Sequence, residues 1–147
     1  MPTPTPRIRP TAGWVMPSRL ERGPNGKALC RECGQEVPPG RRRTFCSQVC
    51  VDTWRTQTDP GYCRTLVWGR DTGVCAICAF DTKNITPQMR KEWSISRHRT
   101  PWEMDHAVPL AEGGLNEMDN FRTLCIPCHK SETVALRKRL TKPVSLS

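Results

Sequence analysis

The pattern of apolar and polar positions predicts a series of short elements after a proline-rich beginning. Residues 1–27 contain six prolines and little apolar periodicity, so we expect a flexible tail there. Apolar residues recur at helical spacing from residue 62 to about residue 71, and Gly73 is placed to end that helix. A second short helix is expected from Ser47, which stands at an N-cap position, through Trp54.

The C-terminal half of the chain alternates between strand-like and helix-like patterns. Residues 103–108 have the length of a strand, and a turn-rich loop over 109–119 separates them from a second strand at 121–124. A helix carrying His129 follows, and the polar stretch 81–101 reads as an insertion that contains a helix. Two short strands and a helix predict a small α+β fold.

Nine cysteines change this picture, because eight of them fall into two sets with metal-ligand spacing. Each Cys-x-x-Cys turn can present two thiolates to one ion, and two such turns complete a tetrahedral zinc site. The two expected structural zinc sites are Cys30, Cys33, Cys46 and Cys50, and then Cys75, Cys78, Cys125 and Cys128. Cys63 has no partner at matching spacing and is expected to be a small buried residue.

These assignments divide the chain into four parts. We expect a tail over 1–27, a zinc-binding module over 28–61, a second domain over 62–141 and a C-terminal tail over 142–147. Only 36% of the residues are hydrophobic, so the apolar core is thin and bound metal is expected to stabilise both folded parts. A disulfide-rich secreted domain is the alternative, and it would require a secretory signal that the sequence lacks.

The charge of the chain indicates a polyanionic partner. Its 23 Lys and Arg residues outnumber 14 Asp and Glu residues, which leaves a formal net charge of +9. A basic surface without a specific partner explains the same numbers. No run is apolar enough to span a bilayer, so we expect an intracellular protein, cytoplasmic or nucleoid-associated and not secreted.

Candidate chemistry is concentrated between residues 102 and 130. Asp105, His106, Asn120 and His129 supply a carboxylate, an imidazole base, an amide and a second metal ligand. An imidazole titrates near ~6.5 and can accept a proton from water at physiological pH. A divalent cation on few protein ligands keeps open positions for phosphate and water, whereas a four-cysteine zinc keeps none. This combination of groups is suited to phosphodiester hydrolysis.

The motifs G-V-C-A-I-C, D-H-A-V-P-L-A-E-G-G and D-N-F-R-T-L-C-I-P-C-H-K resemble the HNH endonuclease family, in the subgroup with a four-cysteine zinc. The resemblance covers residues 62–138. In detail, this stretch is similar to the HNH module of annealing helicases. It implies a ββα-metal core, with Asp105 and His129 as ligands of the catalytic ion. It also implies that His106 is the general base and that Asn120 is a structural amide holding the loop. The implied reaction is metal-dependent hydrolysis of DNA, branched or fork-like substrates included.

The expected catalytic ion is Mg²⁺ or Mn²⁺, with Ni²⁺ or Zn²⁺ as alternatives that a mixed oxygen and imidazole site also accepts. Basic runs flank the motif and are candidates for contact with the DNA backbone. The candidates are Arg41, Arg42, Arg43, Arg97, Arg99, Lys130, Arg137 and Lys138. Glu103 is expected to be solvated or paired with an arginine. His98, in the run R-H-R, is expected to be exposed or to contact phosphate.

Two other classes of protein compete with this interpretation. A non-catalytic zinc-ribbon protein that binds nucleic acid explains the charge and the cysteines, but leaves Asp105, His106, Asn120 and His129 without a role. A treble-clef protein-interaction module shares the cysteine spacing and does not require the basic balance. Sequence preference, the number of strands cut and the oligomeric state are left open.

Overall fold

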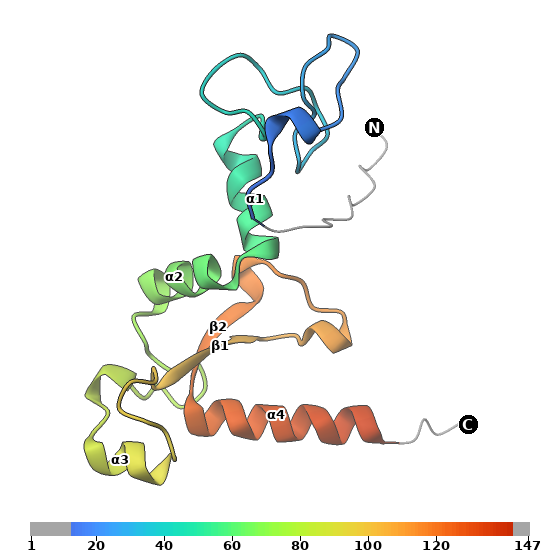
Figure 1. The fold of residues 1–147 in the computed structure, drawn as a ribbon. Helices are drawn as coiled ribbons and strands as arrows, with labels where there is room; N and C mark the ends of the chain where they lie inside the picture. Colours follow the sequence, from blue (N-terminus) through green and yellow to red (C-terminus); the bar gives the residue numbers. More distant parts are fainter. Residues whose placement is uncertain (1–12, 143–147) are drawn as a thin grey trace. The chain divides into compact units, whose positions relative to one another are not determined.

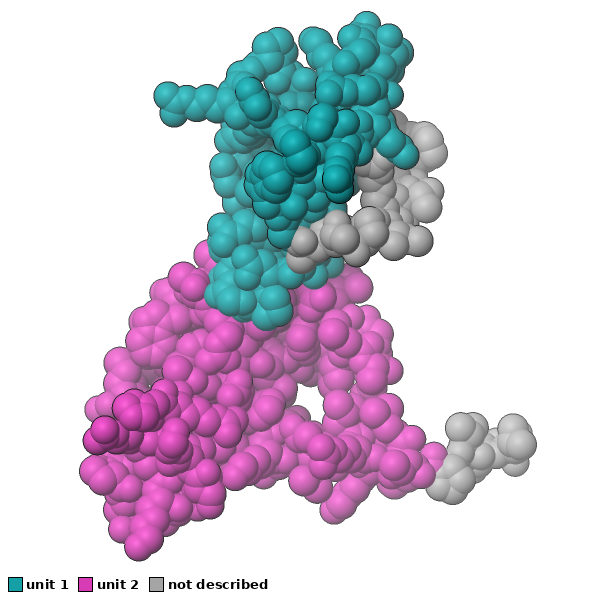
Figure 2. Space-filling view, in the orientation of Figure 1, with its two compact units in different colours: residues 1–63 teal, residues 64–147 magenta. Residues whose placement is uncertain are grey.

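The computed structural model describes residues 13–142. The chain divides into two compact units, Met1–Cys63 and Arg64–Ser147, which are coloured separately in Figure 2. The unit boundary falls close to the boundary expected near residue 61. Much of the expected N-terminal tail, residues 1–12, and all but one residue of the expected C-terminal tail lie outside the described residues.

The first unit contains the 3-10 turn η1 (Pro17–Arg19) and the helix α1 (Gln48–Thr58) (Figure 1). Before α1, short pairings join Arg22 to Ala28 and Leu29 to Glu36. The described part of the expected tail is therefore folded from about residue 21 onward. This hairpin is held by backbone bonds and has little apolar periodicity, so the apolar pattern did not reveal it.

Helix α1 begins as its sequence predicts. The Ser47 side chain accepts a hydrogen bond from the Cys50 backbone N–H at 3.2 Å, which satisfies one of the free donors at the helix start. Trp54 is buried and packs edge-on against Phe45, with the Arg31 guanidinium 4.4 Å from its ring centre. Cys63 is buried, as predicted for a residue outside both metal sites.

Helix α2 (Pro60–Asp71) is followed by Gly73, at a position where the structure requires a glycine. Gly73 has a φ of +79°, a conformation that side chains disfavour. A Cβ atom there would also lie 2.7 Å from the Trp68 ring and 2.8 Å from the Thr82 hydroxyl. The helix ends at Asp71, the left-handed conformation begins at Thr72, and at Gly73 the close approach adds a steric reason for a glycine.

The second unit is built on a two-stranded antiparallel sheet of β1 (Trp102–His106) and β2 (Phe121–Cys125). The 3-10 turns η3 (Leu110–Glu112) and η4 (Met118–Asn120) lie in the connection between the strands, and α4 (Ile126–Thr141) follows β2 (Figure 1). The polar insertion contains η2 (Thr82–Asn84) and α3 (Pro87–Glu92). The small α+β fold expected from the sequence is confirmed.

The end of α2 is fastened to β2 by a pair of neighbouring charged side chains. Arg70 donates to the carbonyl oxygens of Met118 at 2.7 Å and Phe121 at 2.6 Å, and it is paired with Asp71. The hydroxyl of Thr123, a fully buried residue, donates to Asp71 at 2.9 Å. Burial opposes ionisation of Asp71, but the bond from Arg70 outweighs it and the pKa of this carboxyl is lowered.

The core of the second unit joins the sheet to the metal-binding knuckle. Leu124 and Ile126 are almost fully buried, and Leu124 packs with Cys75 and Cys125. Among residues 13–142, no helix is long and apolar enough to cross a lipid bilayer.

Candidate active site and zinc centres

The second cysteine quartet forms a compact cluster of sulfur atoms at the junction of α2, β2 and α4. The four thiols of Cys75, Cys78, Cys125 and Cys128 lie within 4.8 Å of one another. Cys75 comes from the knuckle after α2, Cys125 ends β2 and Cys128 lies in the first turn of α4. Four sulfurs at this separation fit a tetrahedral Zn²⁺ and leave no position open for a substrate.

Backbone donors around this quartet favour a thiolate at Cys75. Burial raises the pKa of the thiol, but backbone N–H groups of Cys78, Cys125 and Ile77 stabilise the thiolate and lower the pKa to about 6. Burial raises the pKa of Cys125 and Cys128 in the absence of a cation. A cation bound to the cluster would favour the thiolate forms of Cys125 and Cys128 as well.

The first quartet repeats this arrangement in the first unit. The thiols of Cys30, Cys33, Cys46 and Cys50 also lie within 4.8 Å of one another. Burial raises the pKa of Cys30, but backbone N–H groups outweigh it and lower that pKa to about 7. Burial raises the pKa of Cys50 to about 12. Within each predicted quartet, the four thiols thus lie close together.

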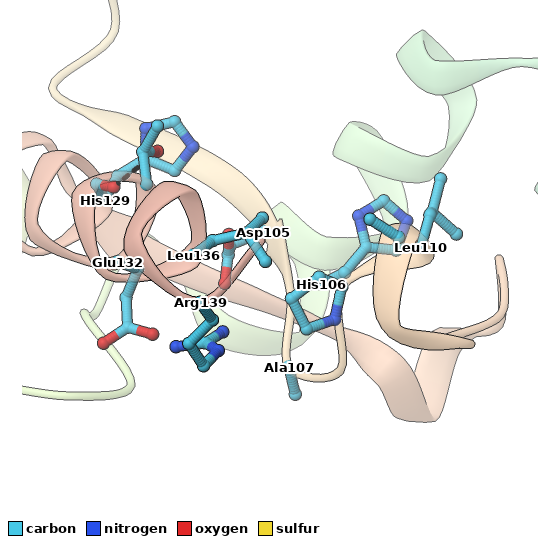
Figure 3. A pocket seen from close by; sticks show the side chains of 11 residues that line it. Asp105, His106, Ala107, Leu110, His129, Glu132, Leu136 and Arg139 are labelled. Atoms are coloured by element: carbon cyan, nitrogen blue, oxygen red, sulfur yellow. Dashed lines mark hydrogen bonds between the residues drawn. The ribbon is translucent and has the colours of Figure 1, made fainter. Parts of the chain in front are cut away.

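A pocket of about 320 Å³ lies between β1, the η3 loop and one face of α4 (Figure 3). Asp105 and His106 line it from β1, and His129 and Glu132 line it from α4. Neighbours in a regular strand point to opposite faces, which would separate Asp105 from His106. Both nevertheless line this pocket, at the end of β1, whose last cross-strand pair is His106 and Phe121.

A guanidinium group bonds both carboxylates near the pocket. Arg122, the cross-strand partner of Asp105, donates to the Asp105 carboxylate at 2.9 Å and to Glu132 at 3.4 Å. Asp105 is largely shielded from solvent, with 18% of its side chain exposed. This part of the pocket therefore stabilises a positive charge between two acidic side chains. Arg122 and Glu132 were not identified from the sequence.

The imidazole of His106 is held by one hydrogen bond and one ring contact. Its Nε2 lies 2.8 Å from the Oδ1 of Asn116, and its ring meets Phe121 edge-on at 5.2 Å between centres. Because an amide oxygen only accepts, the bond requires Nε2 to carry the proton when the ring is neutral. The Nδ1 lone pair is then available as a base. Asn116 was not identified from the sequence, and it lies between the motif that ends at Gly114 and the one that begins at Asp119.

Asn120 lies outside the pocket lining and ties the loop that follows β1. Its Oδ1 accepts from the Val108 N–H at 2.8 Å, and its Nδ2 donates to the carbonyls of Val108 at 3.0 Å and Leu115 at 2.9 Å. Gly114 is needed beside it, because a Cβ there would collide with the Val108 carbonyl and lie 2.9 Å from the Asn120 amide nitrogen. The Asn120 side chain thus holds both ends of the 108–115 loop.

The basic candidates fall into different environments. Arg99 joins Arg64 in pairing with Glu103, and Arg97 bonds the neighbouring His98. Lys130 donates to the Trp93 carbonyl at 3.2 Å. Arg137 and Lys138 are exposed on α4, and Arg41, Arg42 and Arg43 are exposed in the first unit. Arg139, which belongs to the basic run that follows His129 in the sequence, lines the pocket and pairs with Glu112 at 2.7 Å.

The comparisons with known proteins converge on one family. The model of the family described as HNH endonuclease matches residues 75–134. The mouse protein named DNA annealing helicase and endonuclease ZRANB3 is 28% identical over an alignment covering 94% of this chain. The human and bovine proteins of that name are each 24% identical over 77% of this chain.

This chain spans only 16% of the length of the mouse relative and 14% of the other two. No solved structure is significantly similar to it. The matched segment contains both strands, the pocket residues Asp105, His106 and His129, and the second cysteine quartet. Residues 75–134 of this chain are therefore similar to the HNH endonuclease family over the segment that holds the pocket and the second quartet.

Proposed function

We propose that the protein is a metal-dependent endonuclease that hydrolyses DNA phosphodiester bonds in the pocket between β1 and α4. The observation that carries the proposal is the convergence of Asp105, His106 and His129 on this pocket, within the segment that is similar to the HNH endonuclease family. The order of strand, strand and helix around the pocket supports the ββα-metal core in this proposal.

His106 is the general base in this proposal. Its Nδ1 takes a proton from a water molecule as the water oxygen attacks phosphorus. The P–O3′ bond breaks as the new P–O bond forms, and the 3′ oxygen takes a proton from solvent, which leaves a 5′-phosphate and a 3′-hydroxyl. The bond from Nε2 to Asn116 leaves Nδ1 of His106 unprotonated and holds the His106 ring in its orientation.

Asp105 and His129 would hold the catalytic cation. The donor set fits, because the Arg122 guanidinium already occupies a cationic position beside Asp105 and the His129 imidazole lines the same pocket. A bound divalent ion would supply charge stabilisation at the phosphate and the leaving oxygen. A carboxylate and an imidazole suit Mg²⁺ or Mn²⁺, with Ni²⁺ or Zn²⁺ as alternatives. The cysteine zincs are structural.

DNA is the proposed partner because the chain has a net charge of +9 and its relatives are named as DNA annealing helicases and endonucleases. Exposed cations on α4, Arg137 and Lys138, with Lys130 at its start, are proposed to contact the backbone near the pocket. Branched or fork-like DNA is the proposed substrate shape, and a DNA substrate fits an intracellular location.

The proposal is tested by incubating the zinc-loaded protein with supercoiled plasmid and with a labelled branched duplex, each with added Mg²⁺ or Mn²⁺. We expect nicked or linear products with 5′-phosphate ends, and no products without the added ion. An Asp105→Ala variant is expected to lose cleavage. The absence of cleavage of both substrates with every metal, together with tight binding, would identify a non-catalytic nucleic-acid-binding protein.

Asn116→Ala is expected to lower kcat by about 10-fold to 100-fold and to leave KM almost unchanged. Without the Oδ1 acceptor, the His106 ring turns more freely and populates the other tautomer, whose Nδ1 carries the proton. The measurement is steady-state cleavage of a labelled duplex as a function of pH.

A second substitution separates positioning from simple loss of structure. Asn116→Asp places a carboxylate at the same distance, which stabilises the protonated ring, so the acid limb of the pH–rate profile is expected to move to higher pH. An unchanged profile in Asn116→Asp and a full rate in Asn116→Ala would show that Asn116 does not position His106.

A further inference from the structure

A second concave surface lies in the first unit, and its lining includes no residue assigned to catalysis. It is a groove of about 520 Å³ between the 22–28 hairpin and the 37–43 loop. Ala28 and Val37, both buried, form part of its floor. Its charged lining residues are all cations, namely Arg22, Lys27, Arg42 and Arg43.

Within the described residues, no acidic side chain compensates the charge of these four cations. Among residues 13–142, none of the four is paired with a carboxylate. Arg22 donates to the Gly26 carbonyl at 3.4 Å and Arg42 to the Gln48 side-chain oxygen at 3.2 Å, and both acceptors are neutral. Glu36 beside the hairpin is bonded instead by the backbone and side-chain nitrogens of Asn25.

The walls of the groove are held in place by backbone bonds. The Val37 N–H donates to the Ala28 carbonyl and joins the two sides at 2.8 Å. The far end of the 37–43 loop is held by the bond from the Arg31 N–H to the Thr44 carbonyl at 2.9 Å. Beyond it, Cys46 belongs to the first cysteine quartet. A groove anchored at both ends pays little conformational entropy when it binds a ligand.

We propose that this groove binds the sugar-phosphate backbone of DNA, as a contact separate from the catalytic pocket. The inference rests on the proposed function in one respect, since both take DNA as the partner. Duplex DNA carries about one negative charge per 1.7 Å of its axis, so several cations in one groove can each face a phosphate. Arginine suits this role because its planar group bonds phosphate oxygens in pairs.

The structure distinguishes between three neighbouring arginines that the sequence treats alike. Arg42 and Arg43 line the groove, whereas Arg41 does not. Arg22 and Lys27, separated from that run by more than a dozen residues, complete the cationic lining. This division provides a test in which charge is removed either inside or outside the groove of the same unit.

The experiment measures binding of a fluorescein-labelled duplex by anisotropy, at several salt concentrations, with the zinc-loaded full chain and no added Mg²⁺ or Mn²⁺. In Arg42→Gln/Arg43→Gln, the slope of log K against log salt is expected to become shallower by about 2, since each phosphate contact contributes about 0.9. Affinity at 0.1 M salt is expected to fall roughly 60-fold by the same relation. Arg22→Gln/Lys27→Gln is expected to behave similarly.

The matched control is Arg19→Gln/Arg41→Gln, which removes the same charge from two exposed residues outside the groove. It is expected to change affinity less than about threefold. Equal losses in control and groove variants would overturn the proposal in favour of a diffuse electrostatic attraction, and unchanged binding in both groove variants would also overturn it. Zinc content of two ions per chain verifies folding of each variant.

Further outcomes distinguish DNA binding in the groove from binding of acidic protein segments and from the proposed nuclease activity. If poly-glutamate of equal charge displaces the labelled duplex as well as unlabelled duplex does, the groove binds acidic protein segments and the assignment to DNA is wrong. If the unsubstituted protein binds no DNA at all, the proposed function fails together with the inference. DNA binding that depends on the groove, in a protein that cleaves nothing, would uphold the inference and refute only the nuclease.

Discussion

His106→Ala is expected to lower the rate of DNA cleavage by about 10²-fold to 10⁴-fold, the range that a positioned general base contributes. DNA affinity is expected to be unchanged, because the imidazole lines the pocket, is bonded to Asn116 and is not among the cations proposed to contact the backbone. The measurement is single-turnover cleavage of a labelled duplex with saturating Mg²⁺ or Mn²⁺, alongside anisotropy without the metal.

His98→Ala is the matched control, since the chain has three histidines and His98 is the one outside the pocket. It is exposed and bonds only its neighbour Arg97 among the described contacts, so its loss is expected to leave the rate within about twofold. Cleavage by His106→Ala at the rate of the unsubstituted protein would remove the proposed mechanism while leaving metal-dependent cleavage possible.

Cys128→Ser is expected to unfold much of the second unit. A structural zinc contributes about 10–16 kcal/mol of apparent folding free energy in small zinc-finger peptides, which is comparable to the whole stability of a typical domain. The quartet also connects α2, β2 and α4, and Cys75 and Cys125 are part of the buried core around Leu124. We expect zinc content to fall from two ions to one per chain and cleavage to disappear.

The loss of structure is measured by circular dichroism during heating and by metal analysis of the purified protein. Cys63→Ser is the control, because Cys63 is more deeply buried than Cys128 but belongs to neither quartet. That substitution is expected to retain both zinc ions and to cost no more than about 2 kcal/mol. A Cys128→Ser protein that kept two zinc ions and an unchanged melting temperature would show that the quartet is not a structural site.

Several elements could be predicted because their signals are local. Ser47 caps α1 through a bond that spans three residues, and Gly73 follows α2 with the backbone conformation that its type favours. The strand expected over 103–108 is β1, Trp102–His106, which ends two residues earlier. It ends there because Val108 is bonded by the Asn120 side chain and not by a strand neighbour.

The partners of the site residues were less accessible to sequence reasoning. Asp105 and Arg122 meet because strand register places them opposite each other, and the polar pattern alone does not specify register. Glu103 was expected to be solvated or paired with an arginine, and it is paired with Arg64, which lies 39 residues away.

The sequence by itself determined which atoms are available for chemistry. The cysteine spacing predicted two quartets that could hold a metal ion. The motif around Asp105, His106, Asn120 and His129 indicated a similarity to the HNH endonuclease family, whose model matches residues 75–134. Both signals consist of residue types at short separations. The tertiary structure decided which groups act on one another. The bond from His106 to Asn116 and the division between Arg41 and its neighbours depend on how loops close in space, and loop closure depends on backbone bonds and buried contacts that no short motif encodes.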